Sequence, residues 1–110
     1  MKTSPEYQRL IECKGISLRE LGIDDIALNR EDAIGAIELL QTSAIPILGG
    51  DVYNQKANRI ELAYANWHSE PTTTESRTQF AERSCIESKR YIADYPVSDA
   101  VPLFGLVLDL

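Results

Sequence analysis

The stretch that decides the fold is AIPILGGDVYNQKANRIELAYAN, residues 44–66. Its first part, 44–53, is mainly apolar apart from a pair of glycines, and it leads into a polar segment at 54–58. The second part alternates in the way that is typical of a strand with one buried face. Residues 44–66 therefore predict an antiparallel hairpin with a turn at 54–58 and one face in water. On the second strand, one side carries Ile60, Leu62 and Tyr64, and the other carries Arg59, Glu61, Ala63 and Ala65.

Gly49 and Gly50 are unusual because they stand inside the first predicted strand. Glycine there removes side-chain packing and costs conformational entropy, so the backbone must need a positive φ or a close approach. A β-bulge that bends the edge of the hairpin and redirects Asp51 and Tyr53 would meet this need. The functional interpretation is that the same bend presents Asp51 and Tyr53 to a partner.

Two segments before the hairpin have the caps and the spacing of α-helices. The first, 5–14, follows Ser4 as its N-cap and begins with a proline, and Gly15 is expected to end it in the left-handed conformation. The second, 30–42, follows Asn29 as its N-cap and has acidic residues in its first turn, where the helix dipole favours them.

A third helix is predicted over 75–94, after the hairpin. Thr74 is its expected N-cap, and Pro96 ends it. Apolar and small residues recur along it at spacings of three and four, which predicts one buried stripe. The members of this stripe are Phe80, Ala81, Ser84, Cys85, Ser88, Ile92 and Tyr95.

The remaining segments complete a single α+β domain over residues 1–110. Residues 16–28 fit neither the helix nor the strand period, so we expect a packed connection with room for a short helical turn. Residues 103–109 are almost continuously apolar, which predicts a strand covered on both faces or central in the sheet. The sequence thus predicts an antiparallel or mixed sheet of three or four strands, packed with two or three helices.

The charge balance narrows the classes of partner. The chain has 17 Asp and Glu against 11 Lys and Arg, a net charge of -6, which repels nucleic-acid phosphates and anionic lipids. A basic protein would be attracted, although a charge of this size also serves to keep a small domain in solution. Residues 1–6 lack the apolar run of a signal peptide, and no segment approaches a membrane span, so we expect a cytoplasmic protein.

No combination of residues predicts catalysis, a metal or a cofactor. The two cysteines, Cys13 and Cys85, lack metal-ligand spacing, and we expect them to be reduced and mostly buried. His68 is the only histidine, so a nucleophilic triad would need it beside a nucleophile that the sequence does not place there. A small enzyme would require a pocket that gathers Asp51, His68 and Glu70.

Trp67 allows two interpretations. It follows the second predicted strand and precedes the polar run His68-Ser69-Glu70. A single tryptophan in a small domain commonly anchors the core. Its place at the mouth of an acidic loop also suits an interface residue that contributes strongly to binding. A half-buried indole would serve both roles.

The string Gly49-Gly50-Asp51-Val52-Tyr53, followed by a strand and Asn66-Trp67, resembles the immunity protein 40 family of bacterial polymorphic-toxin systems. The helices and the last strand fit the same layout, so the resemblance extends over about 15–108. It implies a protein that binds a secreted toxin and blocks it without catalysis. The characteristic residues by motif position would be Gly49, Gly50, Asp51, Tyr53 and Trp67.

From the charge and this resemblance together, we expect a cognate toxin with a basic contact surface. The surface around Asp51, Tyr53, Trp67, His68 and Glu70 is expected to take part in binding it. A non-catalytic adaptor or regulatory module unrelated to toxins has the same composition and stays open as the alternative. The sequence leaves the oligomeric state undetermined.

Overall fold

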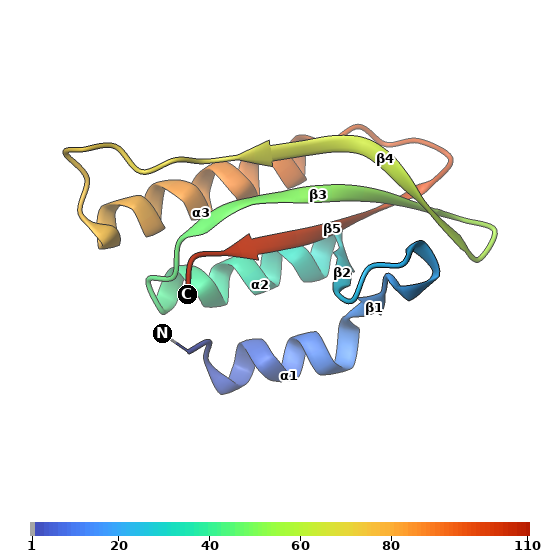
Figure 1. The fold of residues 1–110 in the computed structure, drawn as a ribbon, viewed down its shortest axis with the longest axis horizontal. Helices are drawn as coiled ribbons and strands as arrows, with labels where there is room; N and C mark the ends of the chain where they lie inside the picture. Colours follow the sequence, from blue (N-terminus) through green and yellow to red (C-terminus); the bar gives the residue numbers. More distant parts are fainter. Residues whose placement is uncertain (1) are drawn as a thin grey trace.

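A five-stranded antiparallel sheet and three α-helices make up residues 2–110, the part of the chain that the computed structural model describes (Figure 1). The α+β class is confirmed. In chain order the elements are α1 (Pro5–Lys14), β1 (Ile16–Ser17), the 3₁₀ turn η1 (Arg19–Leu21), β2 (Ile26–Asn29), α2 (Arg30–Thr42), β3 (Ile47–Lys56), β4 (Arg59–His68), α3 (Arg77–Asp94) and β5 (Val101–Leu108).

The predicted hairpin is present as β3 and β4, but its turn is shorter than expected. The strands continue to the pair Lys56 and Arg59, so only Ala57 and Asn58 form the turn. Both have positive φ, 52° and 63°, as a two-residue type I′ turn requires. The polar residues at 54–56 are therefore strand residues, because the hairpin tip extends into solvent and accepts polar side chains.

The sheet has the order β1-β2-β5-β3-β4, which places β5 in the middle as predicted. β5 pairs with β3 on one side and with β2 on the other, and it begins two residues before the predicted start at Leu103. The sheet has five strands, one more than the upper estimate, because 16–28 contributes β1 and β2 besides the short turn η1. At two and four residues, these strands are too short to show a period of two.

Two of the three predicted N-caps are confirmed, whereas the N-cap of the third helix and the predicted conformation at the end of the first are wrong. Ser4 and Asn29 cap α1 and α2 as expected. α3 begins after Ser76, not Thr74, because Ser76 and Gln79 form a reciprocal capping box. Gly15 does not adopt the left-handed conformation; its φ is -63°, and a side chain there would collide with the carbonyl oxygen of Ile11.

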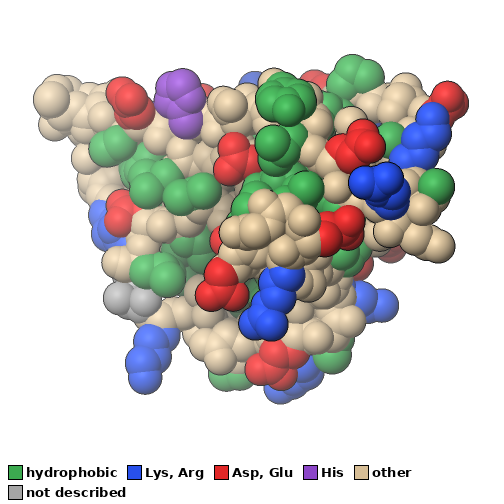
Figure 2. Space-filling model, turned by 45° about the vertical axis from the view of Figure 1, so that its right-hand side comes forward, with side chains coloured by type: hydrophobic (Ala, Val, Ile, Leu, Met, Phe, Trp, Pro, Cys, Tyr) green, Lys and Arg blue, Asp and Glu red, His purple; other side chains and the backbone are tan. Residues whose placement is uncertain are grey.

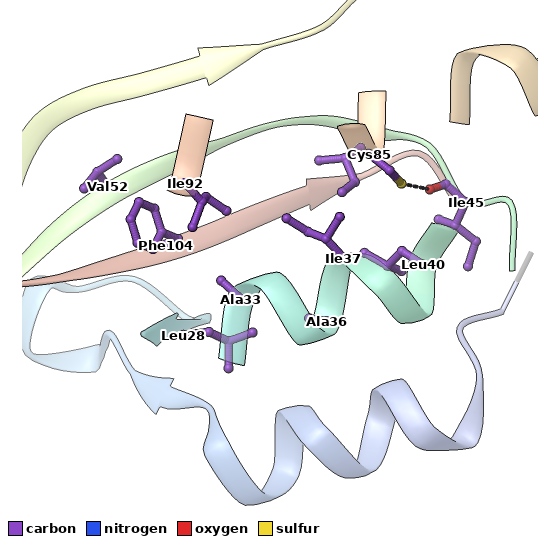
Figure 3. Packing of buried hydrophobic residues seen from close by; sticks show 11 residues of the cluster. Leu28, Ala33, Ala36, Ile37, Leu40, Ile45, Val52, Cys85, Ile92 and Phe104 are labelled. Carbon is purple, nitrogen blue, oxygen red and sulfur yellow. Dashed lines mark hydrogen bonds between the residues drawn. The ribbon is translucent and has the colours of Figure 1, made fainter. Parts of the chain in front are cut away.

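The main core lies between the sheet and the helices α2 and α3 (Figures 1 and 3). Val52 and Phe104, cross-strand neighbours on β3 and β5, contribute from the sheet. α1 lies on the far side of α2 and adds partly buried residues to the same cluster. The fully enclosed members are Leu28, Ala33, Ala36, Ile37, Leu40, Ile45, Ile47, Val52, Cys85, Ile92 and Phe104.

A second, smaller core covers part of the opposite face of the sheet. Leu18, at the start of η1, packs there with Ala27, Tyr53, Ile60 and Leu103. The side chain of Glu20 also accepts a hydrogen bond of 3.4 Å from the backbone N–H of Ile60. The segment with β1 and η1 therefore closes this face near the hairpin tip and leaves the remainder of it open.

The predicted alternation on β4 is confirmed, but the side that carries Ile60, Leu62 and Tyr64 is not the side that faces the helices. Ala63, Ala65 and Trp67 pack against the main core. On the other side, Ile60 is buried under η1, Leu62 is 45% exposed, and Tyr64 is 90% exposed. The side of β4 that faces the helices thus carries two alanines and the indole of Trp67.

Ser84 joins α3 to the start of β3, and its removal should destabilise the fold. Its buried hydroxyl accepts a 3.0 Å hydrogen bond from the backbone N–H of Ile47. We expect Ser84→Ala to lower the free energy of unfolding by about 1–3 kcal/mol, because it leaves a buried donor unpaired. Urea denaturation measures the change, with Thr78→Ala on the exposed side of α3 as the control. An equal effect of both variants would contradict this role.

Candidate functional site

The predicted motif residues occupy neighbouring positions on the hairpin. Gly49 pairs with His68, Gly50 with Trp67, and Asp51 with Asn66. A register irregularity between Ile47 and Gly49 marks a bulge at the start of this region, and Gly49 has a φ of 151°. A bulge is therefore present beside the glycines, but it lies in the pairing of β3 with the central strand β5 and not at the edge of the hairpin, where the pairing of Gly49 and Gly50 with β4 is regular.

The two glycines are needed because Trp67 lies against them. A Cβ on Gly50 would come within 3.0 Å of the indole ring of Trp67 and of the carbonyl oxygen of Gly105. A Cβ on Gly49 would collide with the backbone of Trp67. An aromatic ring that covers a cross-strand glycine compensates for its missing side chain. Gly49 and Gly50 are therefore structural residues, because only glycine at these positions leaves room for Trp67.

Trp67 connects the sheet to α3. Its indole N–H donates a 2.9 Å hydrogen bond to the buried hydroxyl of Ser88, and its ring stacks on Tyr91 with centroids 4.7 Å apart. The edge of the same ring meets Phe104 at 6.4 Å, and Tyr95 packs against both Tyr91 and Phe104. The indole is half-buried. Trp67 is thus a core anchor that keeps part of its ring at the surface.

A shallow groove runs beside this aromatic cluster, with a volume of about 530 Å³. Trp67, His68 and Ser69 form one wall. The other wall is the C-terminal half of α3 and its exit, and it carries Glu87, Arg90, Tyr91, Asp94, Tyr95 and Pro96. Sequence reasoning placed Tyr95 on the helix stripe but missed Tyr91, which lies one turn before it and stacks on Trp67.

The loop after β4 is held in place by Arg83 on α3. Its guanidinium donates to both carboxylate oxygens of Glu75, at 2.6 and 2.8 Å, and to the backbone carbonyl of Glu70, at 2.6 Å. It also reaches Glu87 at 2.9 Å. The hydrogen bonds from Arg83, helped by one from the backbone of Thr72, lower the pKa of Glu75 to about 2. This leaves the side chain of Glu70 exposed on an ordered loop.

Asp51 and Tyr53 lie on the opposite face of the sheet from Trp67. Asp51 is exposed, whereas Tyr53 is only 6% exposed and belongs to the second core under η1. Burial, with smaller contributions from Asp51 and Asp25, raises the pKa of the Tyr53 phenol. The motif thus places Asp51 in solvent and keeps Tyr53 as a packing residue.

The seven predicted site residues therefore do not form one cluster. Asp51, His68 and Glu70 are exposed, Trp67 is half-buried, and Gly49, Gly50 and Tyr53 are buried. Asp51 and His68 line two different hollows, one on each side of β4. Within the described part of the chain, no three His, Cys, Asp or Glu side chains lie close enough together to hold a metal ion.

The two thiols have different surroundings. Cys85 is buried on α3 near the carbonyl oxygen of Ile45, 3.6 Å away, and burial raises its pKa to about 11. The thiol at this position is therefore protonated at neutral pH. Cys13 is exposed on α1, so the prediction that the cysteines are mostly buried holds for Cys85 alone.

The fit between Gly50 and Trp67 can be tested with a matched pair of glycine substitutions. Gly50→Ala should destabilise the protein by roughly 1–3 kcal/mol, because the methyl group must displace the indole ring. The control, Gly35→Ala in α2, adds a methyl group with no neighbouring atom within 4 Å and should stabilise the helix by about 0.5–1 kcal/mol. Thermal unfolding measures both. Equal shifts in the same direction would contradict the account.

The Arg83 network predicts a specific dependence of stability on pH. Because the pKa of Glu75 falls from 4.5 to about 2 on folding, its contribution is complete above pH ~4.5 and is lost as the pH falls through about 2. Glu75→Gln should therefore lose less stability than the wild type between these pH values. The exposed substitution Glu61→Gln is the control. Identical urea midpoints for the Glu75 variant and the wild type throughout this range would refute the assignment.

Comparison with known proteins gives one match. The family model described as immunity protein 40 matches residues 17–108, which is most of the chain. Neither the comparison with curated proteins nor the comparison with solved structures found a match. Residues 2–110 also contain no helix whose length and hydropathy would let it cross a lipid bilayer. The resemblance seen in the sequence is confirmed, and the chain belongs to the immunity protein 40 family.

Proposed function

We propose that this protein is an immunity protein that binds a cognate bacterial toxin in the cytoplasm and neutralises it by direct contact, without catalysis. The observation that carries the proposal is the family match over residues 17–108. A toxin that would harm the cell producing it has to be blocked there. A small folded domain can do this by covering the surface that the toxin uses.

The charge of the chain supports a basic contact surface on the toxin. With 17 acidic against 11 basic side chains, the protein attracts a positively charged partner and speeds its encounter. Complementary charge also disfavours partners of the wrong sign. Association between this chain and its toxin should therefore be faster at low salt than at high salt.

We place the contact along the exposed edge strand β4 and the loop that follows it, where motif residues from both faces of the sheet reach the surface. Asp51, His68 and Glu70 would contact the toxin through their exposed side chains. Trp67 would contribute the exposed part of its ring, while Gly49, Gly50 and Tyr53 would give the hairpin its shape. Support comes from the exposure of the first three and from the loop, which Arg83 orders before any partner arrives. Preordering lowers the entropic cost of binding.

The test of the proposal is growth protection. The toxin domain encoded by the gene adjacent to this one is expressed in a bacterial host with and without the immunity protein. The wild-type protein should restore growth and should co-purify with the toxin domain. If it gives neither protection nor a complex, the proposal is wrong, and the adaptor or regulatory-module interpretation takes its place.

Charge reversal tests where the toxin is contacted. Asp51→Lys and Glu70→Lys should each weaken binding of the toxin domain by roughly tenfold, because each removes an attractive charge and adds a repulsive one. Glu12→Lys on the exposed side of α1 makes the same change in net charge and should leave affinity within about twofold. Titration calorimetry gives the dissociation constants. Equal weakening by all three variants would show that only net charge matters.

A further inference from the structure

Tyr64 occupies a double bulge on the exposed edge strand β4. Val52 pairs with Ala65 and the next residue of β3, Tyr53, pairs with Leu62, so Ala63 and Tyr64 are two extra residues in the ladder. Tyr64 has a φ of 56°, in the left-handed region that bulky residues avoid. Its side chain is 90% exposed. The chain therefore holds an aromatic ring in solvent on a strained backbone.

The fold gives a reason for the bulge but none for a tyrosine in it. A bulge twists an edge strand and so protects it against pairing with other chains. Glycine or asparagine would form the same bulge with less strain. The exposed ring forms no part of either core cluster. Strain of this kind, kept with a side chain that the fold does not use, points to a function outside the fold.

The ring borders a shallow hollow of about 330 Å³ that combines apolar surface with one negative charge. Its lining consists of Asp51, Val52, Tyr53, Leu62, Tyr64, Ala65 and Asn66. Leu62 is 45% exposed beside the ring. Among residues 2–110, no Lys or Arg side chain lies within ion-pair distance of Asp51. Asp51 is thus a carboxylate available to a cation from outside.

A larger area of the surface around β4 also combines hydrophobic and acidic side chains. In Figure 1, β4 runs along the upper edge of the molecule. On the face shown in Figure 2, hydrophobic side chains form a run from the upper edge toward the centre, with acidic side chains on both sides of it. An exposed aromatic residue surrounded by polar groups is the usual composition of an interface hot spot.

We propose that Tyr64 is the anchor of the toxin contact, and that the hollow beside it receives an arginine or lysine side chain of the toxin. The cation would pair with Asp51 while its aliphatic stem packs against the rings and methyl groups of Tyr64 and Leu62. This inference rests on the proposed function and adds to it a residue that the motif does not contain.

A basic partner suits this surface better than a second copy of the chain. Two copies that met through this face would bring Asp51 and a net charge of -6 from each chain together, and the like charges would repel. A toxin surface with a positive charge at the centre would satisfy both the carboxylate and the apolar rim. The inferred occupant is therefore the toxin.

The experiment uses Tyr64→Gly, which removes the ring and relieves the backbone strain in one step. Its unfolding temperature should be equal to or above that of the wild type, whereas its affinity for the purified, catalytically inactivated toxin domain encoded by the adjacent gene should fall at least about tenfold. The control is Ala57→Gly, which relieves a positive φ of 52° in the hairpin turn. It should leave affinity within about twofold.

Each outcome decides between the alternatives. A stable Tyr64→Gly variant that binds the toxin domain as tightly as the wild type overturns this inference and leaves the proposed function intact. A wild-type protein that does not bind the toxin domain overturns both. Self-association of the wild type that is lost in Tyr64→Gly overturns the choice of occupant in favour of a second copy. A lower unfolding temperature for Tyr64→Gly would make the residue structural and would also overturn the inference.

Discussion

The contact between the indole of Trp67 and the bare backbone of Gly50 is the constraint on which the rest of the structure depends. It lets the ring lie flat across β3, and from there its N–H reaches Ser88 on α3 and its face stacks on Tyr91. One side chain thereby fixes the edge strand, the neighbouring strand and the long helix relative to one another. A residue larger than glycine at position 50 would separate these elements, because interiors are packed too densely to absorb a methyl group without movement.

This arrangement leaves the outward side of the hairpin free for binding. With Trp67, Ala65 and Ala63 turned toward the helices, Asp51, Tyr64 and His68 lie on the surface. Four hydrogen bonds from Arg83 order the loop that follows, so Glu70 lies at a fixed position on the surface. A rigid, acidic surface with one exposed aromatic side chain is suited to an inhibitor that docks without rearrangement, which agrees with the assignment to an immunity protein family.

Much of the fold could be predicted because its signals are local. The caps at Ser4 and Asn29, the alternation of 59–66 and the apolar run that becomes β5 each specify an element within a few residues. The strands in 16–28 were missed because a distant contact decides them. β1 and β2 are only two and four residues long, and they are strands because β2 pairs with the distant strand β5 and β1 pairs with β2. The motif residues could be named from the sequence, but their distribution over two faces of the sheet could not. The role of Tyr64 could not be predicted either, because a positive φ at a tyrosine cannot be inferred from sequence.

The central claim is that the hairpin side with Asp51 and Tyr64 meets a basic toxin. Amide hydrogen exchange of the full-length protein, alone and with the inactivated toxin domain, tests it most directly, because exchange reports which backbone segments the partner covers. We predict slower exchange in β4 and the loop after it, over residues 59–70, with α1 unchanged. Slower exchange confined to α1 and the outer side of α2, with none in β4, would contradict the account.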